Sequence, residues 1–506
     1  MLFFVTTCRH LPHAFVTLLP YSEEAGNTGA KIEGRRYTMR TRFIGILTSL
    51  LLIFALAACS GSNDAGNGAT GGQPSNTSGD RQSDSGNSEG GPSPQNGSGS
   101  GISKGEKKTI VFSTFWKDEK FAEAKKRYEA LHPNIEIKLD YIDTDNDQVE
   151  ADLEKFATTV NTAMLAGKGP DLLEMDKLPI DSYVKNGLLI DLETMIERDQ
   201  TFKRDDYFTN ILDNAKVGGG LYGMPLSFFL MGFAGDADAI AKAGVQVDDK
   251  SWSWEDFAQV GNKLVKDGEF KNVIAATPGS LLTMMVTDHY ASFVDVKNKK
   301  ASFDSAAFIA MMQQVKKMSE EGVIGEGRPY FFPTQINSAG DYLTTMQEYL
   351  SKNMHLYAKP HTKETTPGGY FRSYRTIGLN AKSEVKQEAW DFIKFMMSEE
   401  MAYSPLSAGF PINKNVYAKG IEELKGMGSV KGHEEGPLKG ASVQVDDARI
   451  ERLNGYVSGA VHPVAYQSDK IEEIVYQETM AFFSGQKSAE AVAKLIQNKA
   501  TTYLNE

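Results

Sequence analysis

Cysteine is nearly absent from this chain. Two cysteines, Cys8 and Cys59, occur among 506 residues, and both precede the segment that we expect to fold, which begins near Lys107. A structural disulfide and a thiolate metal cage are therefore excluded from the folded part. Its stability has to come from the burial of apolar side chains.

Positive charge is also in deficit, because 54 Lys and Arg residues stand against 66 Asp and Glu residues and give a formal net charge of −12. Proteins that bind nucleic acid usually carry a basic surface, so we expect no nucleic-acid partner. A single hydrophobic core stops growing at roughly 250–300 residues, and a chain of this length is therefore expected to form two lobes.

The signatures of catalysis are missing from residue 107 onward. This part has no G-x-S-x-G elbow, no H-E-x-x-H helix and no phosphate-binding loop with a Walker lysine. We therefore predict that the protein is not an enzyme and needs no cofactor. A secreted carbohydrate-active enzyme remains the alternative, because the two carboxylates of a glycosidase are separated along the chain. The histidines here show no metal-ligand spacing: His132, His289, His355, His361, His433 and His462.

A glycine motif at Gly218-x-Gly220-x-x-Gly223 matches the letters of the dinucleotide-binding fingerprint. That fingerprint needs a strand before it and a helix after it, so that the helix N-terminus meets the pyrophosphate. Here a helix-like segment precedes the glycines, and the strand of Pro225 and Leu226 follows them. We therefore predict a glycine turn that leads into a strand.

The longest apolar run, from Phe43 to Ala57, follows a basic start at Met39 and ends in Leu56-Ala57-Ala58-Cys59. This pattern resembles a bacterial lipoprotein signal, in which the signal peptide is removed and the cysteine thiol carries diacylglycerol. We assign residues 39–58 to the signal peptide, Cys59 to the lipidated mature N-terminus, and residues 1–38 to an upstream extension from a mis-chosen start codon. A retained membrane anchor is the alternative, but the run is shorter than the ~20 residues that a span needs.

The segment 59–106 is rich in Gly, Ser, Asn and Asp, and Ile102 is its only large apolar residue. Such a composition cannot bury enough surface to offset the entropy of ordering, so we predict a disordered tether. A flexible chain of this length spans on average roughly 35–40 Å. We therefore expect a lipid-anchored body on the extracellular face of the cell membrane of a Gram-positive bacterium.

Beyond residue 106, short apolar runs alternate with segments of helical periodicity, which predicts an α/β fold with helices over a mostly parallel sheet. A helix is also expected to begin within 251–257, where Ser and Trp residues precede acidic ones. The remaining expected elements are strands at 109–113, 135–141, 171–175, 224–233 and 377–379, and helices at 121–131, 149–164, 385–396, 471–482 and 491–503.

Several short motifs occur in order along this part of the chain. They are Met164-Leu165-Ala166-Gly167-Lys168-Gly169-Pro170-Asp171-Leu172, Gly187-Leu188-Leu189-Ile190-Asp191-Leu192, Leu221-Tyr222-Gly223-Met224-Pro225, Ile377-Gly378-Leu379-Asn380-Ala381-Lys382-Ser383, Ala389-Trp390-Asp391-Phe392-Ile393-Lys394-Phe395-Met396 and Gly409-Phe410-Pro411-Ile412-Asn413. Each motif is weak alone. Their order across residues 107–506, behind a lipoprotein signal and a tether, resembles the family 1 extracellular solute-binding proteins of ABC importers.

The resemblance implies a two-lobed periplasmic-binding-protein-like fold of type II, with a ligand cleft between lobes joined by a multi-crossing hinge. It places lobe 1 at 107–232 and 376–415, and lobe 2 at 233–375 and 416–506. The hinge crossings fall near 230–236 and 375–377. It also implies a monomer that delivers its ligand to the permease subunits of an ABC transporter. One departure is Phe233-Ala234-Gly235-Asp236, where the family usually has an aromatic-Asn-Lys-Asp run, so the hinge contact of the missing Asn is in question.

Aromatic and polar residues gather at the expected strand ends and loops, where an open α/β sheet builds its ligand crevice. Sugar rings stack their C–H faces on aromatic rings, and their hydroxyl groups pair with Asp, Glu, Arg or Asn. We therefore predict a carbohydrate ligand, an oligosaccharide, and keep a non-sugar solute as the alternative. The candidate ligand residues are Phe115, Trp116, Asp118, Glu174, Asp176, Tyr222, Ser227, Phe228, Phe229, Trp254, Tyr370, Arg372 and Tyr374.

An acidic stretch offers a weak calcium motif, because Asp143, Asp145, Asp147 and Glu154 stand at positions 1, 3, 5 and 12 of a calcium loop. Position 6 is Gln148, where the sharp turn of such a loop favours glycine. We therefore prefer an acidic turn whose carboxylates stabilise the positive end of the following helix, and we expect no metal.

Overall fold

The computed structural model describes residues 107–144, 148–295, 298–348, 353–362, 366–401, 403–432, 440–464 and 469–505. The predicted upstream extension, signal peptide, lipidated Cys59 and tether lie outside these residues, as do Asp145 and Asp147 of the calcium motif. Among the helices of the described segments, none is long and apolar enough to cross a membrane.

An 11-stranded mixed sheet runs through the described part of the chain, and its main path has the order β2-β1-β3-β11-β4-β9-β5-β8. Three further strands attach to this path, because β10 and β12 pair with β4, and β15 pairs with β11. The strands of this sheet are β1 (Lys108–Ser113), β2 (Ile135–Asp140), β3 (Leu172–Glu174), β4 (Met224–Asp236), β5 (Asn272–Ala275), β8 (Ile324–Gly325), β9 (Pro329–Ile336), β10 (Met354–Tyr357), β11 (Gly369–Leu379), β12 (Phe410–Pro411) and β15 (Ala460–Pro463).

Helices follow most strands, as the alternating pattern of the sequence predicts. They are α1 (Glu119–Leu131), α2 (Val149–Leu165), α3 (Ile180–Lys185), α4 (Glu193–Arg198), α5 (Thr209–Asn214), α6 (Ala237–Lys242), α7 (Trp254–Asp267), α8 (Pro278–Asp288), α9 (Tyr290–Phe293), α10 (Ala306–Glu320), α11 (Ala339–Glu348), α12 (Lys386–Met396), α13 (Lys414–Met427), α14 (Asp447–Gly459), α15 (Asp469–Phe483) and α16 (Ala489–Asn505). Two small hairpins complete the fold: β6 (Val294–Asp295) with β7 (Lys300–Ala301), and β13 (Ser429–Lys431) with β14 (Ser442–Gln444).

The predicted elements are confirmed to within a few residues, with two differences. The sheet is mixed rather than mostly parallel, because the central strand β4 pairs antiparallel with β9, β10, β11 and β12. The second difference is the length of one strand. β11 begins at Gly369, whereas the sequence predicts a strand only from Ile377. Its first half alternates aromatic residues with Arg, Ser and Thr and contains no apolar run. That half becomes a strand because β4 supplies a complete antiparallel partner for its backbone.

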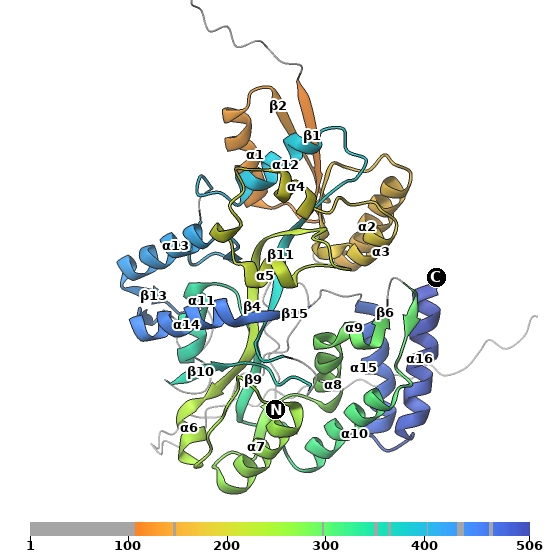
Figure 1. Cartoon of the computed structure of the whole chain (residues 1–506). Coiled ribbons are helices and arrows are strands. Elements are labelled where there is room, and N and C mark those ends of the chain that lie inside the picture. The colour runs from red at the N-terminus through yellow and green to blue at the C-terminus, as the bar shows by residue number, and fades with distance from the viewer. Residues whose placement is uncertain are drawn as a thin grey trace, which may run out of the picture. The chain divides into compact units, whose positions relative to one another are not determined.

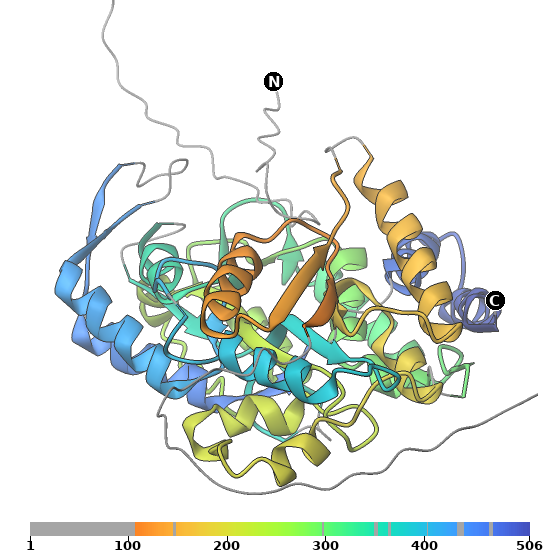
Figure 2. The same cartoon turned by 90° about the horizontal axis from the view of Figure 1, so that it is seen from above.

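Helices flank β1 on both sides, and Figure 2 shows α1 and α2 on opposite sides of it. On one side the ring of Phe112 lies 6.5 Å from that of Phe392 in α12. On the other side the ring of Phe115 lies 5.5 Å from that of Phe156 in α2. The end of β1 is therefore covered on both sides, whereas the edge strand β2 exposes Glu136, Lys138 and Asp140 along one face.

A second core surrounds β5 and β9, with α7, α8, α10, α15 and α16 packed around it. β4 connects the two cores, because Met224 at its start belongs to the first and Phe233 near its end belongs to the second. Figure 1 shows β4 running from β11 toward β9 and β10. The apolar side chains of α13 and α14 join the first core, although our division assigns them to lobe 2, and the lobe boundaries stay a prediction.

Glycine is required at two places near β4. Gly218 and Gly219 have φ of +59° and +92° in a tight turn between Val217 and Gly220, which precedes the strand. This confirms the predicted glycine turn. A β-carbon on Gly235 would lie 2.6 Å from the Tyr357 ring and 2.7 Å from the Phe331 ring. The Lys that the family usually carries here therefore has no room in this chain.

Candidate functional site

One face of the β4–β11 ladder carries most of the candidate ligand residues. Tyr370 pairs with Met231, Arg372 with Phe229, and Tyr374 with Ser227. Side chains of a strand alternate between its two faces, and directly paired residues of antiparallel strands share a face. These six side chains therefore line one surface, which we call the ribbon face.

The centre of the ribbon face is a stack of rings and cations. The rings of Phe229 and Tyr374 are stacked with centroids 4.5 Å apart. The guanidinium group of Arg372 lies 5.4 Å from the Phe229 ring, and that of Arg375 lies 4.5 Å from the Tyr374 ring. Three predicted residues from two strands, Phe229, Arg372 and Tyr374, are thus brought together in a stack of rings and guanidinium groups, in which Phe229 is buried and Tyr374 is partly exposed.

Three carboxylates approach one end of the ribbon face. Asp118 follows β1, and Glu174 and Asp176 stand at and just after the end of β3. β1 and β3 are parallel neighbours, so their carboxyl ends meet at the same edge of the sheet. The three carboxylates therefore converge on Arg375 of β11, which the sequence analysis did not identify.

Asp176 binds the backbone of β11, so its carboxylate is not free to contact a ligand. Its two carboxylate oxygens accept hydrogen bonds from the backbone amides of Arg375 at 2.7 Å and Thr376 at 3.0 Å. Arg375 has a φ of +52°, which is an unfavourable conformation for a residue with a side chain. The paired amides compensate for this local strain.

Asp118 has two partners. One oxygen caps α1 by accepting from the amides of Lys120 at 2.7 Å and Phe121 at 3.3 Å. The other accepts from the Arg375 Nε at 2.7 Å. Asp118 therefore fixes the Arg375 side chain to the start of α1.

Glu174 is electrostatically different from its neighbours. Burial, together with the charges of Asp176 and Asp118, raises its pKa well above the ordinary value for a glutamic acid. Burial also raises the pKa of Asp176, although the amides of Thr376 and Arg375 oppose this effect. A protonated Glu174 can donate a hydrogen bond to a hydroxyl group as well as accept one.

Trp116 lies in the loop between β1 and α1 and remains partly exposed. Its ring packs edge-on against Phe115, with centroids 4.4 Å apart. The same small hydrophobic cluster includes Tyr222 at its border. Trp116 therefore sits two residues before Asp118 with part of its indole open to the surface.

The other end of the ribbon face leads to a buried polar cluster around Tyr370. Lys359 and Asp288 form an ion pair with side chains 4% and 1% exposed, and the Lys359 Nζ lies 5.1 Å from the Tyr370 ring. The backbone oxygen of His361 accepts from the amide of Trp254 at 3.1 Å. Two predicted residues, Trp254 and Tyr370, thus belong to one cluster. It also contains Lys359, Asp288 and His361, which the sequence did not predict.

Several buried polar atoms of this cluster have no hydrogen-bond partner among the described residues. They are the Trp254 Nε1, the Asp288 Oδ2, the His361 Nε2 and the Tyr370 hydroxyl. Buried polar groups in folded proteins almost always have a partner, which is often water. The cluster therefore has unused hydrogen-bonding capacity for water or for the hydroxyl groups of a ligand.

Several candidates are buried, since Tyr370, Trp254 and Phe229 are 1%, 3% and 4% exposed. Phe115 and Phe228 are 1% and 0% exposed and belong to hydrophobic cores. Ser227 is buried, and its hydroxyl donates to the Tyr374 carbonyl at 3.2 Å. No sequence signal distinguished these core residues from the partly exposed ones, because both kinds follow strand-like patterns.

The acidic stretch before α2 gives no structural support for a metal. Glu154 is exposed in α2, and Gln148 caps the helix without a side-chain hydrogen bond. Within the described segments, no group of three or more His, Cys, Asp or Glu residues is placed to hold a metal ion. Asp145 and Asp147 fall outside those segments, so the preferred acidic turn stays a prediction.

Solved structures share the fold of this chain. One is an extracellular solute-binding protein family 1 member from Alicyclobacillus acidocaldarius, with 17% sequence identity, a TM-score of 0.54, and coverage of 79% of this chain and 98% of that one. Another is the sugar-binding protein MalE from Xanthomonas citri, with 14% identity, a TM-score of 0.54, and coverage of 78% and 97%. These similarities confirm the predicted two-lobed periplasmic-binding-protein-like fold.

Sequence comparisons agree with this result. An uncharacterized lipoprotein of Streptomyces antibioticus is 26% identical over 168 residues, which cover 32% of this chain and 35% of that protein. The chain thus matches about a third of the length of this relative. Residues 116–403 match the bacterial extracellular solute-binding protein family. The chain therefore belongs to the family of bacterial extracellular solute-binding proteins.

Proposed function

We propose that this protein is a lipid-anchored receptor that captures a carbohydrate outside the cell and delivers it to the permease of an ABC transporter. The observation that carries the proposal is the ribbon face, where a stacked aromatic surface lies between two sets of hydrogen-bonding groups. The similarity to a sugar-binding MalE supports it. We propose that the ligand is an oligosaccharide.

Each part of a sugar has a matching group in the proposed site. The C–H face of a ring can stack on the partly exposed Trp116. Hydroxyl groups can pair with the Arg372 guanidinium and with Glu174, which can both donate and accept when protonated.

The three gathered carboxylates make a glycosidase the second candidate function. Glycoside hydrolysis needs a general acid and a second carboxylate that acts as a base or nucleophile. Glu174, with its raised pKa, fits the acid. Asp176 is occupied by two backbone amides, and Asp118 by the α1 cap and Arg375. Neither is free to serve as the second group, so we favour binding without catalysis.

A ligand panel tests the proposal. We would measure the melting temperature of the purified protein with sugars and oligosaccharides, and with peptides and phosphonates as non-sugar solutes. A ligand at 100 times its dissociation constant should stabilise the native state by about 2.7 kcal/mol. Stabilisation by an oligosaccharide that is recovered intact supports a receptor. Accumulation of shortened products, with loss of turnover in Glu174→Gln, would establish an enzyme instead.

A further inference from the structure

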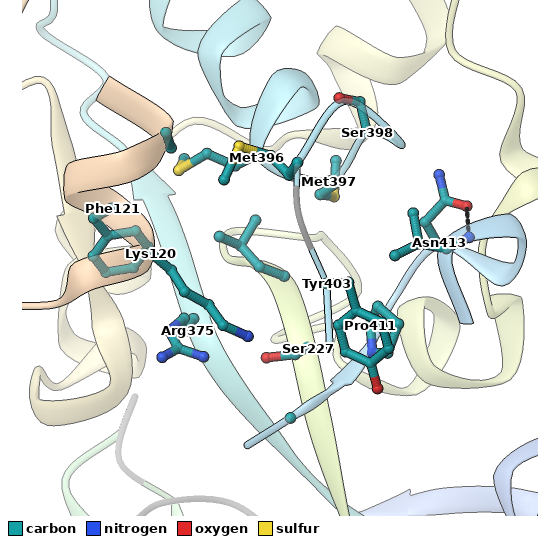
Figure 3. A pocket seen from close by; sticks show the side chains of 15 residues that line it. Lys120, Phe121, Ser227, Arg375, Met396, Met397, Ser398, Tyr403, Pro411 and Asn413 are labelled. Atoms are coloured by element: carbon teal, nitrogen blue, oxygen red, sulfur yellow. Dashed lines mark hydrogen bonds between the residues drawn. The ribbon is translucent and has the colours of Figure 1, made fainter. Parts of the chain in front are cut away.

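A small cavity borders the β4–β11 ladder on the side of α1 and α12 (Figure 3). Its volume is about 70 Å³. One water molecule needs roughly 10–15 Å³ by a comparable measure, whereas pockets for drug-sized ligands usually have 300–1,000 Å³. The cavity therefore suits a group of a few heavy atoms. Its lining includes the polar side chains of Lys120, Ser227, Arg375, Ser398, Tyr403 and Asn413.

The lining carries positive charge without a matching carboxylate. Lys120 and Arg375 both reach the cavity, and none of its lining residues is Asp or Glu. Arg375 is paired with Asp118 through its Nε. The Lys120 Nζ has no ion pair or hydrogen bond among the described residues, and it lies 5.8 Å from the centre of the Tyr403 ring.

The environment penalises the charge of Lys120. Burial and the nearby positive charge of Arg375 lower the pKa of Lys120 to about 8, although Asp118 opposes this effect. An ammonium group in such a place is stabilised by an opposite charge within hydrogen-bond distance. An anion in the cavity would supply that charge.

A neutral donor completes the cavity. The Tyr403 hydroxyl is buried and has no hydrogen-bond partner among the described residues. Tyr403 lines the same cavity as Lys120 and Arg375, and Figure 3 shows the Lys120 and Arg375 side chains extending toward one another. Donors from three separate segments thus border one space, and charge-assisted hydrogen bonds to an oxyanion are among the stronger ones in proteins.

We propose that this cavity binds a small oxyanion, a phosphate or carboxylate group, held by Lys120, Arg375 and Tyr403. The site shares Ser227 and Arg375 with the border of the ribbon face, but it includes none of the side chains proposed to contact the sugar, which are Trp116, Glu174, Arg372 and Tyr374. A bound anion would link α1, β11 and the segment after α12. This inference goes beyond the proposed receptor function, and it holds whichever solute the ribbon face binds.

Thermal unfolding of the full chain tests the inference. We would titrate inorganic phosphate at constant ionic strength, with sodium chloride as the reference, and follow the melting temperature. A saturable increase is expected with phosphate. Sodium acetate provides a second arm, because a response to acetate alone would assign the site to a carboxylate rather than to phosphate. No saturable response to either anion would overturn the proposal.

Variants locate the response. Lys120→Met should weaken the affinity for the bound anion tenfold to hundredfold, which corresponds to a charge-assisted hydrogen bond of about 1.5–3 kcal/mol. Lys126→Met on the same helix is the matched control, because Lys126 is exposed and does not line the cavity. An equal response in both variants would contradict the site. Should Lys120→Met fail to fold, Tyr403→Phe, which removes only a hydroxyl group, should still weaken anion binding, and an unchanged affinity would overturn the assignment.

Sugar binding is measured separately on the same samples. A protein that binds an oligosaccharide but shows no anion response refutes the cavity and leaves the receptor function intact. A protein that responds to the anion but to no sugar supports the cavity and refutes the carbohydrate receptor.

Discussion

Asp118 shows how one side chain can connect a helix to a distant strand, β11. It caps α1 with one oxygen and binds the Arg375 side chain with the other. Arg375 in turn lies over the Tyr374 ring. The position of the aromatic surface on the ribbon face therefore depends on a carboxylate that comes from a different strand.

Trp116 provides the first test at the residue scale. Replacing it with Ala should cost binding of the best sugar ligand about 1–3 kcal/mol, because its exposed indole surface is lost from the contact. Unfolding should be affected less, since part of the side chain is already in water. Affinity by calorimetry and the melting temperature of the ligand-free protein measure the two effects.

Trp390 is the matched control, because it is fully buried in the first core. Trp390→Ala should destabilise folding by about 3–5 kcal/mol, with or without ligand. If Trp116→Ala behaved like Trp390→Ala, or folded well with unchanged affinity, Trp116 would not belong to the site.

Glu174 gives a pH-dependent prediction. Its folded pKa is raised above the ordinary value, so its favourable contribution is present at low pH and is lost as the pH rises through the folded pKa. Glu174→Gln removes this titration and should increase the free energy of unfolding near neutral pH. Urea unfolding between pH 4 and pH 8 measures it. A variant that is less stable than the parent at neutral pH would show that the carboxyl is ionised and favourably paired.

At the scale of the element, β11 contains a strained residue held by a neighbouring carboxylate. Asp176→Ala leaves the amides of Arg375 and Thr376 without their acceptors. Two unsatisfied amides should destabilise the protein by about 2–4 kcal/mol. Asp205→Ala is the control, because Asp205 is exposed, and it should change the free energy of unfolding by less than about 0.5 kcal/mol. Equal effects of the two changes in urea unfolding would refute the role of Asp176.

β4 gives a packing prediction. Gly235→Ala places a β-carbon within 2.8 Å of the Phe331 and Tyr357 rings, and this overpacking should cost about 1–3 kcal/mol. Gly455→Ala in α14 has open space around the new carbon, and it should be neutral or stabilising by up to about 1 kcal/mol. Thermal unfolding of the two variants distinguishes them, and a stable Gly235→Ala protein would show that β4 can shift away from β9 and β10.

At the scale of the whole molecule, the proposed function requires attachment to the membrane. Cys59→Ala should release the protein into the medium or leave an unprocessed precursor, because no thiol remains at the predicted cleavage site to accept the lipid. Detergent-phase partitioning and the mass of the product from whole cells measure this. Membrane-bound protein with unchanged processing would disprove the lipoprotein assignment.

The sequence alone determined the α/β class, the ends of elements such as α1 and α2, and the family. Those features depend on local periodicity, capping residues and short motifs, and each of these involves residues that are close together in the sequence. The capping box at Ser253 is an example, since its partner Asp256 is three residues away.

Only the tertiary structure decided which aromatic residues are exposed and which polar groups meet. Phe228 and Phe229 are adjacent in sequence and both are buried, yet only Phe229 lies on the ribbon face, because the pairing with β11 sets the orientation of β4. Lys359 meets Asp288 across 71 positions of the chain, and Arg375 meets Asp118 across 257. Such contacts follow from how distant strands and helices pack, and no local pattern in the sequence encodes them.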